Sequence, residues 1–269
     1  MDKALPLAKT LSDEFAQKCC VAQHKSSSVQ ARTVLSGLSL GSFLAEAGWY
    51  QEAETTFAAC LQLSQLRVDG VDNDSKYVAM SAECCLRLMA VLNANCKYAE
   101  SWEACKKASA FFDRLDGRLS SSSSSSLSSL SSSLVNRAGL LAERCSLFFA
   151  KSQYDVAYSS AEEALEQLKD DLPPKTVVDV LRHAAKACVV KREFEKAELL
   201  VRGAVNLAWE EFGKEHPKFA DALTDYGFYL LNVDCISQAV VVYTLALNCR
   251  KNCFKGSNIN VASSHEVIA

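Results

Sequence analysis

A repeated phrase constrains the fold of this chain more than any other feature of its sequence. Each copy contains an apolar helical stretch, a small or polar turn, in most copies an aromatic residue, and then a second helical stretch. The copies read LGSFLAEAGWYQEAETTFAACL at 40–61, RCSLFFAKSQYDVAYSSAEEAL at 144–165, AAKACVVKREFEKAELLVRGAV at 184–205, YGFYLLNVDCISQAVVVYTLAL at 226–247 and, more weakly, LMAVLNANCKYAESWEACKKAS at 88–109. A unit of this kind cannot bury its apolar face alone, whereas stacked neighbours bury a continuous core. The sequence therefore predicts a stacked array of helix pairs.

The small residues in each copy indicate which repeat this is. Aligned on one small position, the copies follow at steps of 48, 56, 40 and 42 residues, from Ala53 to Ser101, Ala157, Ala197 and Ala239. The first copy also has the Leu40-Gly41, Tyr50 and Phe57 of the tetratricopeptide consensus, with Cys60 in place of the last alanine. Small residues let the two helices approach closely, and larger ones fill the space between successive pairs. We predict an all-α fold, a right-handed α-solenoid of tetratricopeptide helix hairpins.

The copies divide the chain into predicted parts. These are a helical or partly disordered lead-in at 1–34, units one and two at 35–118, a disordered poly-Ser loop at 119–134, units three to five at 135–254, and the start of a truncated sixth unit at 255–269. The serine run cannot bury enough apolar surface to offset its ordering entropy, so we favour a tolerated insertion over a phosphorylated switch. Because the sixth unit has only begun at Ala269, we expect the chain to be a fragment or a truncated sequence.

Composition excludes several classes of protein. The 29 Lys and Arg residues nearly balance the 32 Asp and Glu residues, which lacks the basic excess of a nucleic-acid binder. No run of about 18 uncharged apolar residues occurs, so we predict no transmembrane helix, and the first residues do not resemble a secretory signal. The 12 cysteines are scattered without C-x-x-C or zinc-ligand spacing, so we interpret them as buried structural thiols of an intracellular protein.

One pattern with catalytic associations occurs, at Gly37-Leu38-Ser39-Leu40-Gly41. G-x-S-x-G forms a nucleophile elbow only between a strand and a helix. Here it falls inside the first helix of a repeat, so we interpret it as a helix-packing seam. The four histidines have no evident base role, and we predict no catalytic residue, no metal and no cofactor.

The predicted architecture suggests peptide binding by the first helices of successive repeats, which line a concave groove. The predicted peptide-binding residues are Asp179, Arg182, Lys186, Asp221, Phe228 and Asn232. The two cations are four residues apart and face one side, where they could hold a peptide carboxylate, while an aspartate could pair with a basic residue. The alternative, a solvated charged face with weak ion pairs, is the more frequent outcome for such residues.

Several phrases go beyond the repeat consensus. They are AGWYQEAE at 47–54, NCKYAES at 95–101, FFAKSQYDVAY at 148–158, VVDVLRHAAKACVVKREFEKAE at 177–198 and HPKFADALTDYGFYLLNVD at 216–234. Together with FGKEHP at 212–217, they resemble the kinesin-light-chain-like tetratricopeptide proteins over about 35–115 and 135–265.

The resemblance implies a non-catalytic receptor. It implies a substrate-recognition subunit of a cullin-2 RING ubiquitin ligase, which reads C-terminal degrons. In such proteins N-terminal helices are expected to dock the elongin–cullin adaptor, and we expect these helices to be largely missing from this sequence. The alternative implied function is a microtubule-associated adaptor for transport or sorting of membrane proteins. The implied partners are protein C-terminal tails, elongin and cullin-2, the cytoplasmic tail of the amyloid precursor protein, and microtubules. The implied location is cytoplasmic, with cytoskeletal, peripheral-membrane and nuclear pools.

Overall fold

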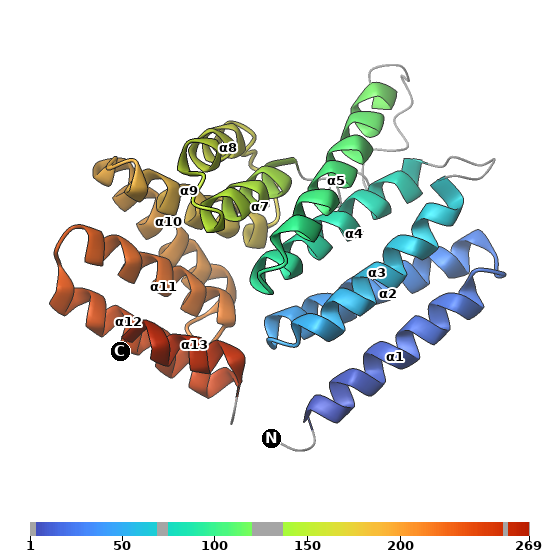
Figure 1. Cartoon of the computed structure of the whole chain (residues 1–269), viewed down its shortest axis with the longest axis horizontal. Coiled ribbons are helices and arrows are strands. Elements are labelled where there is room, and N and C mark those ends of the chain that lie inside the picture. Colours follow the sequence, from blue (N-terminus) through green and yellow to red (C-terminus); the bar gives the residue numbers. More distant parts are fainter. Residues whose placement is uncertain (1–3, 69–74, 120–136, 255–257, 269) are drawn as a thin grey trace. The chain divides into compact units, whose positions relative to one another are not determined.

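The computed structural model describes residues 4–68, 75–119, 137–254 and 258–268. Every regular element in these ranges is a helix, as Figure 1 shows. The predicted poly-Ser loop falls on 120–136, outside the described residues. The chain divides into two compact units, Met1–Asn136 and Arg137–Ala269, and each is described by itself.

The described residues of the first unit form two helix hairpins and one additional helix. The helices are α1 (Ala4–Ala22), α2 (Ser27–Glu46), α3 (Tyr50–Val68), α4 (Ser75–Ala94) and α5 (Tyr98–Leu119). The α2/α3 and α4/α5 hairpins correspond to the first two copies of the repeat, and α1 packs mainly against α3. Helix α2 begins at Ser27, inside the predicted lead-in, so the first hairpin starts before the predicted residue 35.

In the second unit, residues 137–254 and 258–268 form three hairpins followed by a single helix. The helices are α7 (Arg137–Ala150), α8 (Tyr154–Glu166), α9 (Pro174–Val190), α10 (Phe194–Phe212), α11 (Pro217–Asn232), α12 (Ile236–Cys253) and α13 (Ile259–Ile268). Helices α7, α9 and α11 are the first helices of their hairpins, and each packs against the next. The helical prediction is confirmed, since the described residues form tetratricopeptide-type hairpins and contain no strand.

All five hairpins turn in the same way. One turn residue in each has a positive φ: Gly48 (82°), Cys96 (58°), Ser152 (57°), Arg192 (62°) and Asp234 (58°). Each lies five residues before the aligned small residue. In every turn the next amide donates back into the first helix, for example Glu193 N to Cys188 O at 3.0 Å, as in a Schellman motif. The weak second copy, with Cys96, therefore has the same turn as the strong ones.

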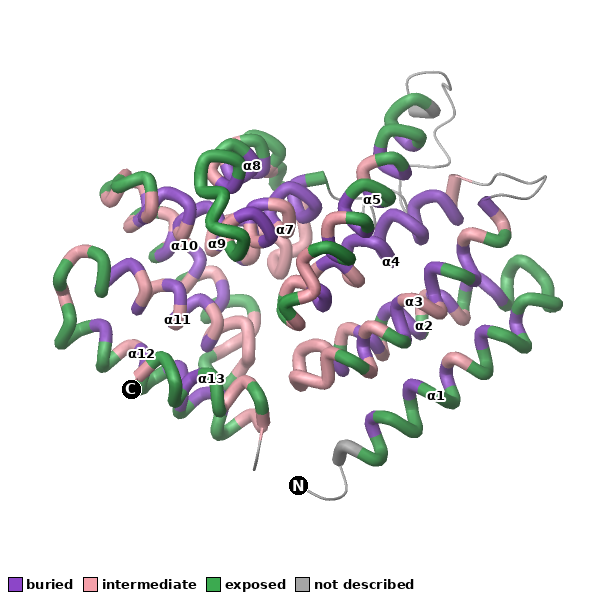
Figure 2. The backbone as a smooth tube through the Cα atoms, in the orientation of Figure 1, coloured by how far each residue is buried: buried purple, intermediate pink, exposed green. Residues whose placement is uncertain are grey.

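The aligned small residues lie at the centre of each hairpin. Ala53, Ser101, Ala157, Ala197 and Ala239 are all 0% exposed, and Figure 2 shows buried positions following the inner faces of the helices. Close approach at the crossings also requires glycine. A Cβ atom on Gly41 would lie 2.5 Å from the Phe57 ring, and one on Gly227 would lie 2.6 Å from the Tyr243 ring. Ser39 and its flanking glycines lie within α2, so the G-x-S-x-G pattern is part of a packed helix.

The cysteine prediction is confirmed for most positions and wrong for two. Eight thiols are buried: Cys19, Cys60, Cys84, Cys85, Cys105, Cys145, Cys188 and Cys249. Cys20 and Cys96 are exposed, and Cys235 and Cys253 are half-buried. Cys96 occupies the left-handed turn position of its hairpin, which faces solvent, so it is not a packing residue.

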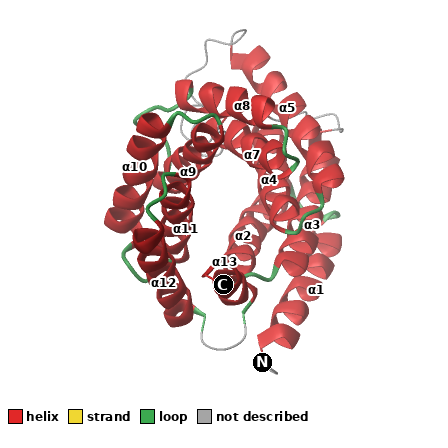
Figure 3. Cartoon of the chain, turned by 60° about the vertical axis from the view of Figure 1, so that its left-hand side comes forward, coloured by secondary structure: helices red, strands yellow, loops and turns green. Residues whose placement is uncertain are grey.

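Helix α4 is the apolar centre of the first unit. Within the described ranges it is the one helix that is long and apolar enough to cross a membrane by length and composition. However, 72% of its most apolar window is buried inside the unit, as expected for a core helix. Figure 3 shows the helical architecture in a second orientation.

Candidate functional site

The six predicted peptide-binding residues lie on two neighbouring first helices of the second unit. Asp179, Arg182 and Lys186 are on α9, spaced so that they share one helix face. The other three, Asp221, Phe228 and Asn232, lie on α11, which packs against α9. The structure therefore brings the two groups of predicted residues together. We call the side formed by α7, α9 and α11 at these positions the first-helix face.

Arg182 is surrounded by carboxylates. Its Nε donates to Asp225 Oδ2 at 2.8 Å, and its Nη1 lies 3.1 Å from Asp179 Oδ1 and 3.6 Å from Asp221 Oδ2. Its side chain is only 12% exposed. Burial opposes the charge of this guanidinium, but the three carboxylates outweigh that effect and raise its pKa. Arg182 is therefore engaged within the protein, and its predicted contact with a peptide stays a prediction.

Two further cations complete the cluster. Lys218 Nζ, from the first turn of α11, contacts both Asp179 oxygens at 2.5 and 2.6 Å. Arg250, from α12, donates to Asp221 Oδ1 at 2.8 Å and to Ser264 Oγ on α13 at 2.7 Å. We call these contacts the inter-repeat ionic network, formed by Asp179, Arg182, Lys186, Lys218, Asp221, Asp225 and Arg250.

The sequence-based reasoning missed Asp225, Lys218 and Arg250. Asp225 had a detectable signal, because it lies one turn after Asp221 on the same face of α11. The other two had none, since Lys218 extends back from a helix start and Arg250 comes from a second helix. A search confined to consensus positions on first helices therefore finds only part of the network.

The carboxylates of the network are ionised at neutral pH. Burial alone would raise the pKa of Asp225, but Lys186 and Arg182 outweigh burial and lower it. Burial likewise opposes the charge of Asp179, where Lys218 and Arg182 lower the pKa well below its usual range. For Asp221, Arg182 and Arg250 have the same net effect. Lost solvation is replaced here by short charge-assisted contacts.

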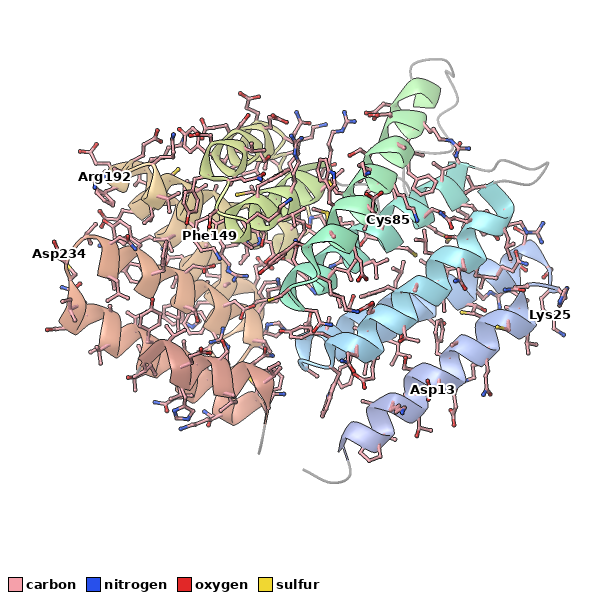
Figure 4. The ribbon with its side chains drawn as sticks, viewed as in Figure 1. Asp13, Lys25, Cys85, Phe149, Arg192 and Asp234 are labelled. Carbon is pink, nitrogen blue, oxygen red and sulfur yellow. The ribbon has the colours of Figure 1, made fainter. Side chains whose placement is uncertain are left out.

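Lys186 has a different environment from the other three cations. Its Nζ lies 3.5 Å from Asp225 Oδ1, and its side chain is 24% exposed. The same ammonium lies 5.4 Å from the centre of the Phe149 ring on α7. Phe149 in turn packs edge-on against Phe228 of α11, with ring centres 6.1 Å apart. Figure 4 labels Phe149 in the second unit. A partly exposed ammonium and two aromatic rings from three consecutive hairpins thus share the first-helix face.

His183 lies on α9 beside the network and is 9% exposed. Its Nδ1 is buried and has no hydrogen-bond partner. Burial, together with the charges of Lys186 and Arg182, lowers the pKa of His183 to about 3. The imidazole is therefore neutral at physiological pH.

Asn232 makes a local contact, with Nδ2 donating to Phe228 O at 2.8 Å one turn earlier. Its predicted role in peptide binding stays a prediction. No group of three or more His, Cys, Asp or Glu side chains is arranged to hold a metal ion anywhere in the described ranges.

The hairpins, their common turn and the stacking of first helices define the class of this chain. It is a tetratricopeptide-type helical-hairpin protein, a fold whose stacked repeats present extended surfaces for other proteins. The solved structure of BtubC (BKLC) from P. vanneervenii has the same type of fold, with a TM-score of 0.52 and 15% identity over 81% of this chain and 84% of that one.

In sequence, the chain is similar to amyloid protein-binding protein 2. The chain is 44% identical, along all of its 269 residues, to the protein of that name from Rattus norvegicus and to the one from Mus musculus. It spans 43% of the length of these relatives. No family model matches the chain. The resemblance predicted from the sequence phrases is thus confirmed.

Proposed function

We propose that this chain is a non-catalytic substrate-recognition part of a cullin-2 RING ubiquitin ligase. It binds C-terminal peptide degrons on the first-helix face of the second unit. Catalysis belongs to other subunits, and the contribution of this chain is proximity, because a bound substrate is held near the transferase. The proposed location is the cytoplasm, with cytoskeletal, peripheral-membrane and nuclear pools.

One observation supports the binding step above all others. Phe149, Lys186 and Phe228 come from three consecutive hairpins and lie together on one face. A peptide that crosses the first helices would contact all three. Aromatic rings supply contact area at low entropic cost, and an ammonium supplies a charge-assisted hydrogen bond.

A second candidate function is a microtubule-associated adaptor that sorts membrane proteins such as the amyloid precursor protein. The similarity to amyloid protein-binding protein 2 supports it, because the name of that relative describes binding to an amyloid protein. The same first-helix face would bind the cytoplasmic tail of the cargo.

Affinity purification from cells tests both functions. The longest natural product that contains this sequence is tagged and purified, and elongin, cullin-2, tubulin and the amyloid precursor protein are measured among its partners. The ligase function predicts elongin and cullin-2, together with longer half-lives of reporters carrying C-terminal degrons after depletion of the protein. Tubulin and precursor tails without elongin or cullin would favour the adaptor. Fractionation of the same cells tests the proposed location.

A further inference from the structure

The charges of the inter-repeat ionic network do not balance. Three of its cations each have a short contact to a different carboxylate: Lys218 to Asp179, Arg250 to Asp221, and Arg182 to Asp225. The longest of these three contacts is 2.8 Å. Four cations therefore face three carboxylates, and one positive charge remains.

The remaining cation is Lys186. Its only carboxylate partner in the described part of the chain is Asp225 at 3.5 Å, beyond the usual range of a hydrogen bond from an ammonium. Asp225 already accepts from Arg182 through its other oxygen. An ammonium has three donors, so Lys186 retains donor capacity that the folded chain does not use.

Lys186 lies where a ligand can reach the unused hydrogen-bond donors of its ammonium. Its side chain is 24% exposed, whereas those of Arg182, Lys218 and Arg250 are 10 to 13% exposed. The Phe149 ring lies beneath the ammonium, and Phe228 extends the apolar surface onto α11. An anion bound there would be partly shielded from water, which strengthens its attraction to the charge.

We infer that Lys186 Nζ binds a carboxylate of the peptide ligand, while the adjoining peptide side chain packs on Phe149 and Phe228. Arg182 acts as a positioning residue, because it neutralises Asp225 and leaves Lys186 available. This inference rests on the proposed function in assuming that a peptide lies on the first-helix face. The carboxylate comes either from the end of a chain or from an Asp or Glu side chain, and the chemistry at Lys186 is the same.

The test begins with a random decapeptide library displayed with free C-termini and selected on the full 269-residue chain. Each selected peptide is synthesised as the free acid, as the C-terminal amide, and with its Asp and Glu residues changed to Asn and Gln. Binding is measured by fluorescence anisotropy to the wild type and to Lys186→Met, which keeps an apolar stem over Phe149. The matched control is Lys191→Met, since Lys191 pairs at a hairpin turn with exposed Asp155.

Loss of one charge-assisted hydrogen bond should weaken binding about 10- to 100-fold. We expect Lys186→Met to show this loss, Lys191→Met to bind like the wild type, and Lys186→Arg to recover part of the affinity. One of the two modified peptides should bind the wild type more weakly by the same factor as the free acid loses with Lys186→Met. That peptide shows where the bound carboxylate comes from. If it is the amide, the carboxylate is the chain terminus, and if it is the Asn/Gln form, the carboxylate is a side chain. Either result supports the inference.

Two other results would overturn it in distinguishable ways. Peptides that bind Lys186→Met as tightly as the wild type, with circular dichroism showing both folded, would refute the role of Lys186 and leave peptide binding intact. A library that yields no binder to the wild-type chain would contradict peptide binding by the first-helix face, and the inference with it.

Discussion

The two units contain the same hairpin but join successive helices with different chemistry. In the first unit the most buried side-chain contacts between helices are neutral, whereas its ion pair from Lys97 to Glu54 on α3, at 2.8 Å, is partly exposed. Ser81 Oγ donates to Ser64 Oγ at 2.8 Å between α4 and α3, and Thr56 donates to Ser12 at 3.3 Å between α3 and α1. In the second unit the inter-repeat ionic network joins α9 to α11 and α11 to α12. The repeat geometry therefore does not dictate the contacts, and charged contacts leave an unbalanced ammonium that neutral ones cannot provide.

The difference should be largest when one contact is removed from each unit. Asp225→Ala leaves Arg182 and Lys186 without their nearest carboxylate, and breaking a buried ion pair costs about 3 kcal/mol or more. Ser81→Ala removes a neutral hydrogen bond and should cost about 1 kcal/mol. Urea unfolding measures both values. Asp155→Ala is the control, since the Asp155 side chain is 91% exposed and its loss should leave the midpoint unchanged. Equal losses for Asp225→Ala and Ser81→Ala would remove the distinction between the units.

A fall in pH should also destabilise the second unit more than the first. The pKa of folded His183 is about 3, against an ordinary value of 6.5, so between these values the unfolded chain binds a proton that the folded chain does not. Stability of the second unit should therefore fall as pH drops from 6.5 towards 3, by up to about 1.4 kcal/mol per pH unit. The lowered pKa values of the network aspartates add a further loss below their ordinary 3.8.

The buried Cys85 thiol of the first unit stays neutral through that range, since burial raises its pKa to about 12. Urea unfolding at several pH values, compared with His183→Gln, measures the effect. The variant should show a flatter dependence between pH 6.5 and about 4. A slope unchanged in His183→Gln would show that another group titrates.

Overpacking the helix crossings should affect both units alike. Gly41→Ala in the first unit and Gly227→Ala in the second each place a Cβ within 2.6 Å of an aromatic ring, so each should lose about 1 to 3 kcal/mol. Gly203→Ala is the control, because its Cβ would lie 3.7 Å from Leu181 Cδ1, and alanine in a helix is favoured by about 0.5 to 1 kcal/mol. The urea unfolding midpoints of the three variants measure these changes in stability. A loss in only one unit would mean that the hairpins are not equivalent.

The smallest effect is expected at the turns. Arg192 has a φ of 62°, which costs a non-glycine residue about 1 kcal/mol or more, and glycine offsets part of this through its own entropy. Arg192→Gly should therefore raise the free energy of unfolding by up to about 1 kcal/mol, and with it, slightly, the thermal midpoint. Gly48→Ala, at the same place in the first unit, should lower it by a similar amount. A lower midpoint for Arg192→Gly would indicate that its side chain stabilises the turn.

The sequence was sufficient to predict the hairpins because small residues recur where the helices cross. Between the last two hairpins, α10 ends at Phe212 before Gly213, and α11 begins at Pro217, where His216 Nδ1 accepts from Lys218 N at 3.1 Å. The second copy was weak because Ser101 replaces the aligned alanine. Ser101 is nevertheless fully buried, since its hydroxyl donates to Asn93 Oδ1 at 2.6 Å.

The site was less predictable, for a physical reason. Helical periodicity places Arg182 and Lys186 on one face but does not identify the partners that reach them from other helices. Whether each cation is neutralised depends on contacts across 29 to 43 residues of sequence, as between Arg250 and Asp221 or Arg182 and Asp225. The sequence alone could therefore not distinguish an engaged guanidinium from an available ammonium.

The network also has a consequence for how the second unit opens. Lys218 of α11 holds Asp179 of α9, Arg182 of α9 holds Asp225 of α11, and Arg250 links α11 to α13 through Ser264. Separating any one of these helices would leave buried charges on its neighbours unmatched, so partial opening is costly. Amide hydrogens in α9, α11 and α12 should then exchange with nearly the same free energy, as one cooperative block. In the first unit the buried contacts between helices are neutral and its Lys97–Glu54 ion pair is partly exposed. Opening should cost less there, so the hairpins should exchange one by one, as nearest-neighbour repeats do.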